Sequence, residues 1–177
     1  MPHINTGPGQ HDPTVSAFII RLDKEPRIIL HIHKYTGTYL HFGGHIERDE
    51  DPWQCLVRET KEESGYDISQ LKILQPKNSL KDLGEANIHP LPFLSVTYHY
   101  KELDHFHDDY KYAFVTHEEP KDKPKKGESE AIRSFSRKEL LELPDGQIKP
   151  RDRELCLYVL DELMSDWRPL DTGLFRS

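Results

Sequence analysis

Three glutamates and one arginine stand close together in the middle of the chain, in the pattern Arg58-Glu59-x-x-Glu62-Glu63. On a helix the three carboxylates fall at positions i, i+3 and i+4, and therefore on one face. Like charges at this spacing repel one another, so a cation bound between them relieves the repulsion. Oxygen ligands favour a hard ion such as Mg²⁺ or Mn²⁺, and Mg²⁺ commonly bridges to substrate phosphates. The pattern therefore indicates phosphate chemistry, although a solvated acidic helix face has the same composition.

The flanking residues predict where this helix begins and ends. Asp51 and Pro52 are typical of an N-cap and a first helical residue, and Gly65 is typical of the residue that ends a helix. The apolar run 39–42 before Gly43-Gly44 predicts a strand that enters a glycine turn and then a loop. The glutamates would then lie on a helix that is joined to this strand by the glycine turn and the loop.

The same segment resembles a known signature. Its pattern, G44-x5-E50-x7-R58-E59-T60-x-E62-E63-x-G65-Y66, is similar to the Nudix box, G-x5-E-x7-R-E-U-x-E-E-x-G-U, in which U is aliphatic. Thr60 and Tyr66 depart from it at two packing positions, and Phe42 replaces the proline that commonly precedes the glycine pair. Chance agreement at so many spaced positions is remote, so the resemblance is specific even though the box is short.

The resemblance implies an α/β fold, a Nudix-type α/β/α sandwich with a mixed central sheet. It also implies an enzyme that hydrolyses a pyrophosphate bond in a nucleoside diphosphate linked to another moiety. Glu59, Glu62 and Glu63 would be catalytic and would hold Mg²⁺, with Mn²⁺ as a substitute, assisted by the backbone carbonyl of Gly43. The alternative is a catalytically silent nucleotide-sensing or interaction protein. An intact box favours the enzyme, because a binding module gains nothing from repelling carboxylates without their metal.

Further residues are assigned by the same resemblance or by their neighbours in sequence. Arg58 would pair with a box carboxylate, Glu50 being expected, and hold the helix in register with the loop; an ordinary surface ion pair is the alternative. One carboxylate would take a proton from the attacking water. The box glutamates are candidates, and so are Glu128 and Glu130, for which a solvated acidic loop is the alternative. Glu47 is expected to be an exposed loop carboxylate.

Substrate identity depends on residues outside the box. A nucleoside triphosphate or a noncanonical nucleotide is the leading candidate by elimination, because residues 81–84 carry neither hint that accompanies ADP-ribose or dinucleoside polyphosphate hydrolases. Phe42 could stack on a base, although aromatic residues in strands are commonly core. Glu128 is a further candidate for substrate binding.

Histidines form a second group of candidates. The run HFHDDYKY is similar to one that follows the box in some bacterial Nudix proteins, so His105 or His107 is expected to border the substrate pocket, with surface polarity as the alternative. A His-x-His pair on a strand can also bind a transition metal. The spacing identifies no third ligand for such a site.

Composition bounds the class of protein. With 31% charged residues and a net charge of −7, the chain has no apolar run near the roughly 18 residues of a membrane span. We expect a cytoplasmic protein, since residues 1–13 lack the features of a secretion signal. The acidic balance argues against nucleic acid as a partner. The resemblance to the Nudix box implies a small-molecule nucleotide or nucleotide derivative as the partner. A homodimer is left open. Cys55 and Cys156 are expected to be buried and unpaired.

The remaining patterns predict a flexible arm over residues 1–13 and a single domain over residues 14–177. Two β-rich runs, Val15–Leu22 and Arg27–His33, are separated by a turn cluster and predict a hairpin. Phe93–Tyr100 and Tyr110–Thr116 predict another antiparallel pair. Shorter strands are expected near 71–74 and 132–135, a short helix around 140–141, and a terminal helix over 152–166.

Overall fold

The computed structural model describes residues 7–78, 84–101 and 104–175. Its strands are β1 (His11–Leu22), β2 (Pro26–Ile32), β3 (Tyr39–Leu40), β4 (Phe42–His45), β5 (Lys72–Gln75), β6 (Leu94–Tyr100), β7 (His105–Thr116), β8 (Ile132–Ser136) and β9 (Arg168–Asp171). Its helices are α1 (Pro52–Ser64), α2 (Arg137–Glu142), α3 (Pro150–Tyr158) and α4 (Met164–Asp166), and a π-helical turn at Val159–Leu163 joins α3 to α4.

All of these strands belong to one sheet, whose main path is β3-β2-β1-β7-β5-β9. Three further strands pair beside this path: β4 with β1, β6 with β7, and β8 with β2. The two long central strands, β1 and β7, run parallel, whereas β1 is antiparallel to both β2 and β4. The sheet is therefore mixed, as predicted.

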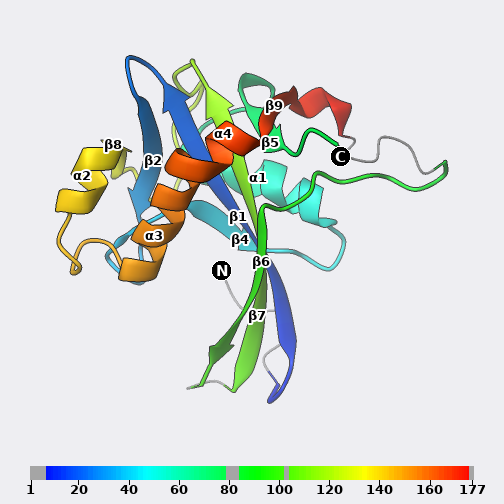
Figure 1. The fold of residues 1–177 in the computed structure, drawn as a ribbon. Coiled ribbons are helices and arrows are strands. Elements are labelled where there is room, and N and C mark those ends of the chain that lie inside the picture. The colour runs from blue at the N-terminus through cyan, green and yellow to red at the C-terminus, as the bar shows by residue number, and fades with distance from the viewer. Residues whose placement is uncertain (1–6, 79–83, 102–103, 176–177) are drawn as a thin grey trace.

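Helices cover both faces of the sheet, with α1 on one side and α3 and α4 on the other (Figure 1). Alternation along β1 explains the two layers, because successive side chains of a strand point to opposite faces. Val15, Ala17 and Ile19 enter the core cluster that contains Leu56 of α1. Phe18 and Ile20 enter the other cluster, which also contains residues of α2 and α3 and of the π-helical turn. This arrangement is the predicted α/β/α sandwich.

The predicted hairpin is present, with β1 and β2 in register from Ile19↔Ile29 to Leu22↔Pro26. The second antiparallel pair, β6 with β7, is also present, but β7 begins at His105 and is longer than predicted. Strand β9 was not predicted. Its four residues are too short and too polar to stand out from a loop, and only pairing with β5 makes them a strand.

Two boundaries near the site differ from prediction. Gly43 and Gly44 lie within β4 and not in a turn. Position 43 requires glycine because β4 packs closely on β1, so that a Cβ atom there would lie 2.1 Å from the carbonyl oxygen of Val15. The predicted arm of residues 1–13 is also wrong at its end. Strand β1 begins at His11, and Asp12 is fully buried beside β7. Residues 1–6 of the arm lie outside the described residues, and the single domain stays a prediction.

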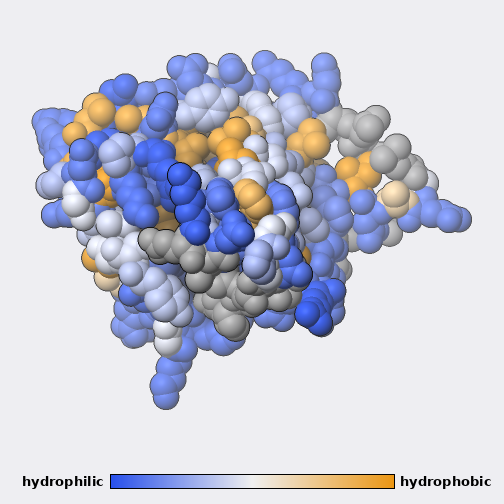
Figure 2. Space-filling view, turned by 90° about the horizontal axis from the view of Figure 1, so that it is seen from below, coloured by the Kyte–Doolittle hydropathy of each residue, from blue (hydrophilic) through white to orange (hydrophobic). Residues whose placement is uncertain are grey.

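The face of the molecule seen in Figure 2 is mostly hydrophilic, and its hydrophobic residues lie in several separate groups. This agrees with the mean hydropathy of −0.76. Among the described residues, no helix combines the length and the apolar character that a bilayer span requires.

Candidate active site

Local sequence forms helix α1, and the structure confirms both predicted ends. Asp51 adopts an extended backbone, and its side chain accepts a hydrogen bond of 2.8 Å from the backbone N–H of Gln54. Gly65 has φ 77°, a left-handed conformation that favours glycine, and its N–H donates to the carbonyl of Lys61. Space is a second reason for glycine there, because a Cβ atom would lie 2.0 Å from the carbonyl oxygen of Asp122.

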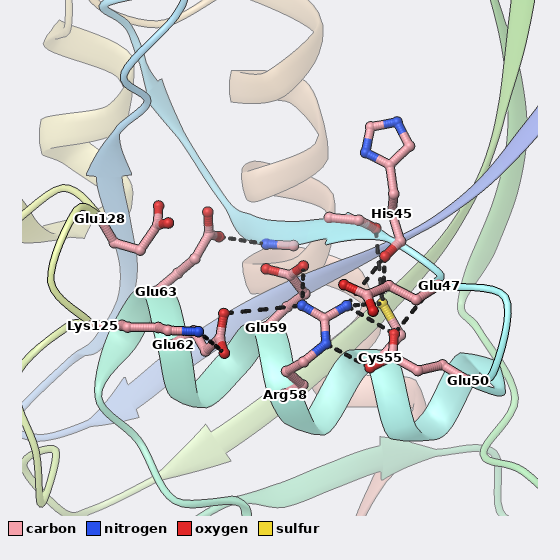
Figure 3. Close-up of polar contacts among 12 residues, drawn as sticks. His45, Glu47, Glu50, Cys55, Arg58, Glu59, Glu62, Glu63, Lys125 and Glu128 are labelled. Carbon is pink, nitrogen blue, oxygen red and sulfur yellow. Dashed lines mark hydrogen bonds and ion pairs between the residues drawn. The ribbon is translucent and has the colours of Figure 1, made fainter. Parts of the chain in front are cut away.

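The three glutamates of the pattern project from α1 towards β4 and the loop that carries Glu128 (Figure 3). Glu59 and Glu63 are buried, whereas Glu62 is half-buried and pairs with Lys125 Nζ at 2.6 Å. The Oε2 atom of Glu63 accepts a hydrogen bond of 2.7 Å from the backbone N–H of Gly43. Gly43 therefore orients Glu63 through its amide, and its predicted role as a metal ligand through its carbonyl stays a prediction.

Burial and mutual repulsion raise the pKa values of the two buried glutamates, Glu59 and Glu63. Burial, followed by the charges of Glu59 and Glu128, raises the pKa of Glu63 to about 8, even though the Gly43 amide opposes the shift. Burial also raises the pKa of Glu59, against the lowering effect of Arg58. His31, with Nε2 3.9 Å from Glu63, supplies no charge near neutral pH, because burial lowers its pKa to about 4. Carboxylates that share a site without enough positive charge fit a hard divalent cation.

Arg58 does what the sequence predicts, and it contacts two box carboxylates at once. Its Nε and Nη2 atoms donate to the two oxygens of Glu50 at 2.5 and 2.8 Å, and Nη1 donates to Glu59 at 2.7 Å. Its Nη2 also donates to the carbonyl of His45, at 3.2 Å. Hydrogen bonding to Glu50 raises the pKa of Arg58, and the same bonds hold the pKa of Glu50 low. Arg58 thus ties the start of the loop, the box carboxylate and the helix together.

Glu47 is exposed, as expected.

A cavity of about 790 Å³ opens over the buried glutamates. Of the residues predicted for the site, Gly43, Glu59, Glu63, His107 and Glu128 line it. Its acidic lining residues are Glu59 and Glu63 of α1, Glu128 and Asp152, and its lining also includes the basic residues Lys34, Lys149 and Arg151. The cavity therefore offers carboxylates for a cation and cations for an anion.

Of the three side chains predicted as aromatic or imidazole substrate contacts, His107 lines the cavity, whereas Phe42 and His105 do not. Phe42 is fully buried, packs 5.0 Å from the ring of His31 and is not among the described residues that line the cavity. It points into the core because β4 pairs with β1 in a register that sets Phe42 opposite Ala17. His105 is also fully buried outside the cavity lining, where its Nε2 lies 3.0 Å from Nε2 of His107. His105 therefore contacts the cavity-lining His107 from the buried side and does not reach the cavity itself.

Several lining residues were not found from sequence. Tyr35 is 73% exposed at the cavity, next to Lys34, and Lys149 and Arg151 flank the first residue of α3. The first two lie in a polar loop and the other two at a helix start far along the chain, so each has the appearance of an ordinary surface residue. Their aromatic and basic types were the available signal, and such side chains are common on protein surfaces that bind nothing. Cys55 and Cys156 are both free and buried, as expected.

Comparison with known proteins identifies the relatives of this chain. A family model described as the NUDIX domain matches residues 10–157. A hydrolase of the NUDIX family from Clostridium perfringens is 29% identical, with a TM-score of 0.70 over 84% of this chain and 95% of that one. Among curated proteins, none matches the chain.

Two more distant structures share the fold alone. One is the Escherichia coli dihydroneopterin triphosphate pyrophosphohydrolase, which is 13% identical with a TM-score of 0.59 over 87% of this chain and 98% of that one. The other is the C. elegans Ap4A hydrolase, 18% identical with a TM-score of 0.55 over 77% of this chain and 88% of that one. The family match spans most of this chain, and the box geometry agrees with it. The chain therefore belongs to the Nudix family and is a pyrophosphohydrolase of that type.

Proposed function

We propose that this enzyme hydrolyses the pyrophosphate bond of a nucleoside diphosphate linked to another group, with a nucleoside triphosphate or noncanonical nucleotide as the leading substrate class. The observation that carries the proposal is the cavity, in which the buried Glu59 and Glu63 share one space with Lys34, Lys149 and Arg151. A diphosphate needs both a divalent cation and direct positive charge, and this wall supplies positions for both.

Mg²⁺ is the proposed cofactor, and Mn²⁺ is the proposed substitute. The carboxylates of Glu59, Glu62 and Glu63 and the carbonyl of Gly43 would hold the ion, since this all-oxygen set has the chemistry that Mg²⁺ prefers. When bound, Mg²⁺ supplies a Lewis acid for the phosphate oxygens and lowers the pKa of a bound water. Arg58 would act as a positioning residue, because it fixes Glu59 and Glu50 relative to the β4 backbone.

The proton of the attacking water needs an acceptor on the protein. We propose Glu128, which lines the cavity, raises the pKa values of Glu59 and Glu63, and lies apart from the box. Its carboxylate is paired with Lys34 at 3.3 Å. A substrate phosphate would attract Lys34 and leave the Glu128 carboxylate available to the water. Glu130, the other loop candidate, is exposed and is the matched control.

Tyr35 is the proposed base contact in place of Phe42. Its ring is exposed at the cavity and lies 5.6 Å from the ring of His33, so the two rings offer an aromatic surface to a nucleobase. Tyr35→Leu is expected to raise KM about tenfold for a nucleotide substrate with little change in kcat. An unchanged KM would remove Tyr35 from the proposal.

A substrate panel tests the reaction. The panel holds ordinary and oxidised nucleoside triphosphates, nucleotide sugars, Ap4A and dihydroneopterin triphosphate, each with Mg²⁺ or Mn²⁺, and released phosphate and pyrophosphate are measured. We expect the enzyme to turn over one class of compound, and to do so only when metal is present. Glu128→Gln should lower kcat about a hundredfold, whereas Glu130→Gln should keep a kcat near that of the wild type. Tight binding of one compound without turnover of any would support the silent sensor instead.

The setting of the enzyme is proposed on simpler grounds. Two buried free thiols suit a reducing compartment, so we propose the cytoplasm. A small nucleotide or nucleotide derivative is the proposed partner, and a homodimer is tested by sedimentation.

A further inference from the structure

A second group of ligand-type side chains lies beside the carboxylate site and is chemically different from it. The group consists of Asp12, His45 and His107, whose potential ligand atoms all lie within 4.8 Å of one another. We propose that these residues form a binding site for a divalent transition-metal ion of the zinc class, distinct from the Mg²⁺ site of the box. Binding at this site does not depend on the proposed substrate or mechanism.

Strand pairing sets the three residues side by side on neighbouring strands. Asp12 of β1 is the direct partner of His107 in the parallel pair with β7. His45 of β4 is opposite Thr14, which lies two residues beyond Asp12 on the same face of β1. Ligands carried by paired strands are held more precisely than ligands on loops. The three side chains therefore converge on one point because of backbone register.

The spacing is close to that required by one ion. Zinc bonds to nitrogen and oxygen are about 2.0–2.2 Å, so two ligand atoms on a tetrahedral ion stand roughly 3.4 Å apart. Oδ2 of Asp12 and Nε2 of His45 are 3.9 Å apart, which is too long for a hydrogen bond and close to the distance between two ligands. Small side-chain rotations bring such a group to bonding distance, and the strands need not move.

Burial and surrounding groups favour a metal at this position. The Asp12 side chain is fully buried, His107 is buried, and the His45 side chain is 14% exposed. A buried carboxylate beside two imidazoles has the ligand types of transition-metal sites and differs from the all-oxygen set of the box. His105 holds the His107 ring through their 3.0 Å contact, and the Tyr100 ring lies 4.3 Å from it. Such outer contacts commonly orient metal-bound histidines.

The site also faces the substrate cavity. His45 and His107 line that cavity together with Glu59 and Glu63, whereas Asp12 is not among the described residues that line it. Three protein ligands leave coordination positions for water or for an oxygen of a bound molecule. The ion would therefore be reachable from the cavity.

Metal binding to the complete protein tests the proposal. Chelator-treated protein is titrated with Co²⁺ or Zn²⁺ in the presence of about 10 mM Mg²⁺, with Co²⁺ followed by its visible absorption and Zn²⁺ by calorimetry. We expect the wild type to bind one equivalent of Co²⁺ or Zn²⁺ with a Kd near or below about 1 µM. Asp12→Asn and His107→Gln should each bind the ion at least a hundredfold more weakly, whereas Glu63→Gln should bind it as the wild type does. His99→Ala is the matched control, because His99 lies on β6 and pairs with Asp104 at the exposed surface.

Either of two titration outcomes would overturn the proposal. One is a wild-type protein that takes up no Co²⁺ at about 100 µM. The other is binding that survives in Asp12→Asn and His107→Gln but is lost in Glu63→Gln, which would assign the ion to the box. X-ray absorption of the zinc-loaded wild type needs no variant to fold. It should show scattering from two imidazoles, and a carboxylate-only environment would contradict the site.

Discussion

Replacement of Glu63 by Gln should abolish turnover and yet stabilise the metal-free protein in alkaline solution. The side chain is 10% exposed, and its pKa is raised from 4.5 to about 8, chiefly by burial. Because folding raises this pKa, the folded state holds the proton more tightly than the unfolded chain does. The resulting stability is fully present below about pH 4.5 and is lost as the pH rises through about 8.

The size of the effect follows from the shift. Each pKa unit corresponds to about 1.4 kcal/mol, so the full shift would amount to roughly 5 kcal/mol. Because the ionisation of Glu63 is coupled to that of the neighbouring Glu59, we expect about 2–4 kcal/mol at pH 9. Gln carries no charge at any pH, and its amide oxygen can still accept the hydrogen bond from Gly43. The variant should equal the wild type in stability near pH 5 and exceed it near pH 9.

Urea unfolding with EDTA at pH 5, 7 and 9 measures the stabilities, and kcat with Mg²⁺ measures the activity. We expect a loss of at least about a hundredfold in kcat. Glu62→Gln is the matched control. It sits on the same helix, but its carboxylate is half-buried and already paired with Lys125, so no alkaline gain is expected. The reasoning fails if Glu63→Gln follows the wild-type pH dependence, or if it keeps near wild-type turnover.

Three further substitutions and one glycine control test the framework around the glutamates. Arg58→Lys keeps the charge but loses the two-pronged contact, so kcat/KM should fall about 10- to 100-fold and stability by about 1–3 kcal/mol; equal values would make the ion pair incidental. Gly43→Ala forces a methyl group to 2.1 Å from a carbonyl oxygen of β1 and should cost more than about 3 kcal/mol or prevent folding. Gly146→Ala, in open space, should stay within about 1 kcal/mol by the same urea assay. Thr60→Val removes a buried hydroxyl that has no hydrogen-bond partner among the described residues. The free energy of unfolding measured in urea should rise by about 1 kcal/mol. A fall in that free energy would indicate that the hydroxyl has a partner.

Sequence alone determined helix α1 and the chemistry that it carries. The cap at Asp51, the stop at Gly65 and the spacing of Glu59, Glu62 and Glu63 are local features, so no distant residue is needed to read them. The pairing of Arg58 was predictable for the same reason, because its partner belongs to the same short motif. The hairpin of β1 and β2 was likewise local.

Tertiary structure decided which other residues meet the glutamates. Asp12 of β1, His45 of β4 and His107 of β7 lie together because β1 and β7, which are distant in sequence, pair in parallel. The register of such a pair is set by burial over the whole sheet. The antiparallel pairing of β4 with β1 turned Phe42 towards the core, and the start of α3 brought Arg151 to the cavity wall. Sequence spacing carries no information on such contacts, because they depend on which strand face the core requires.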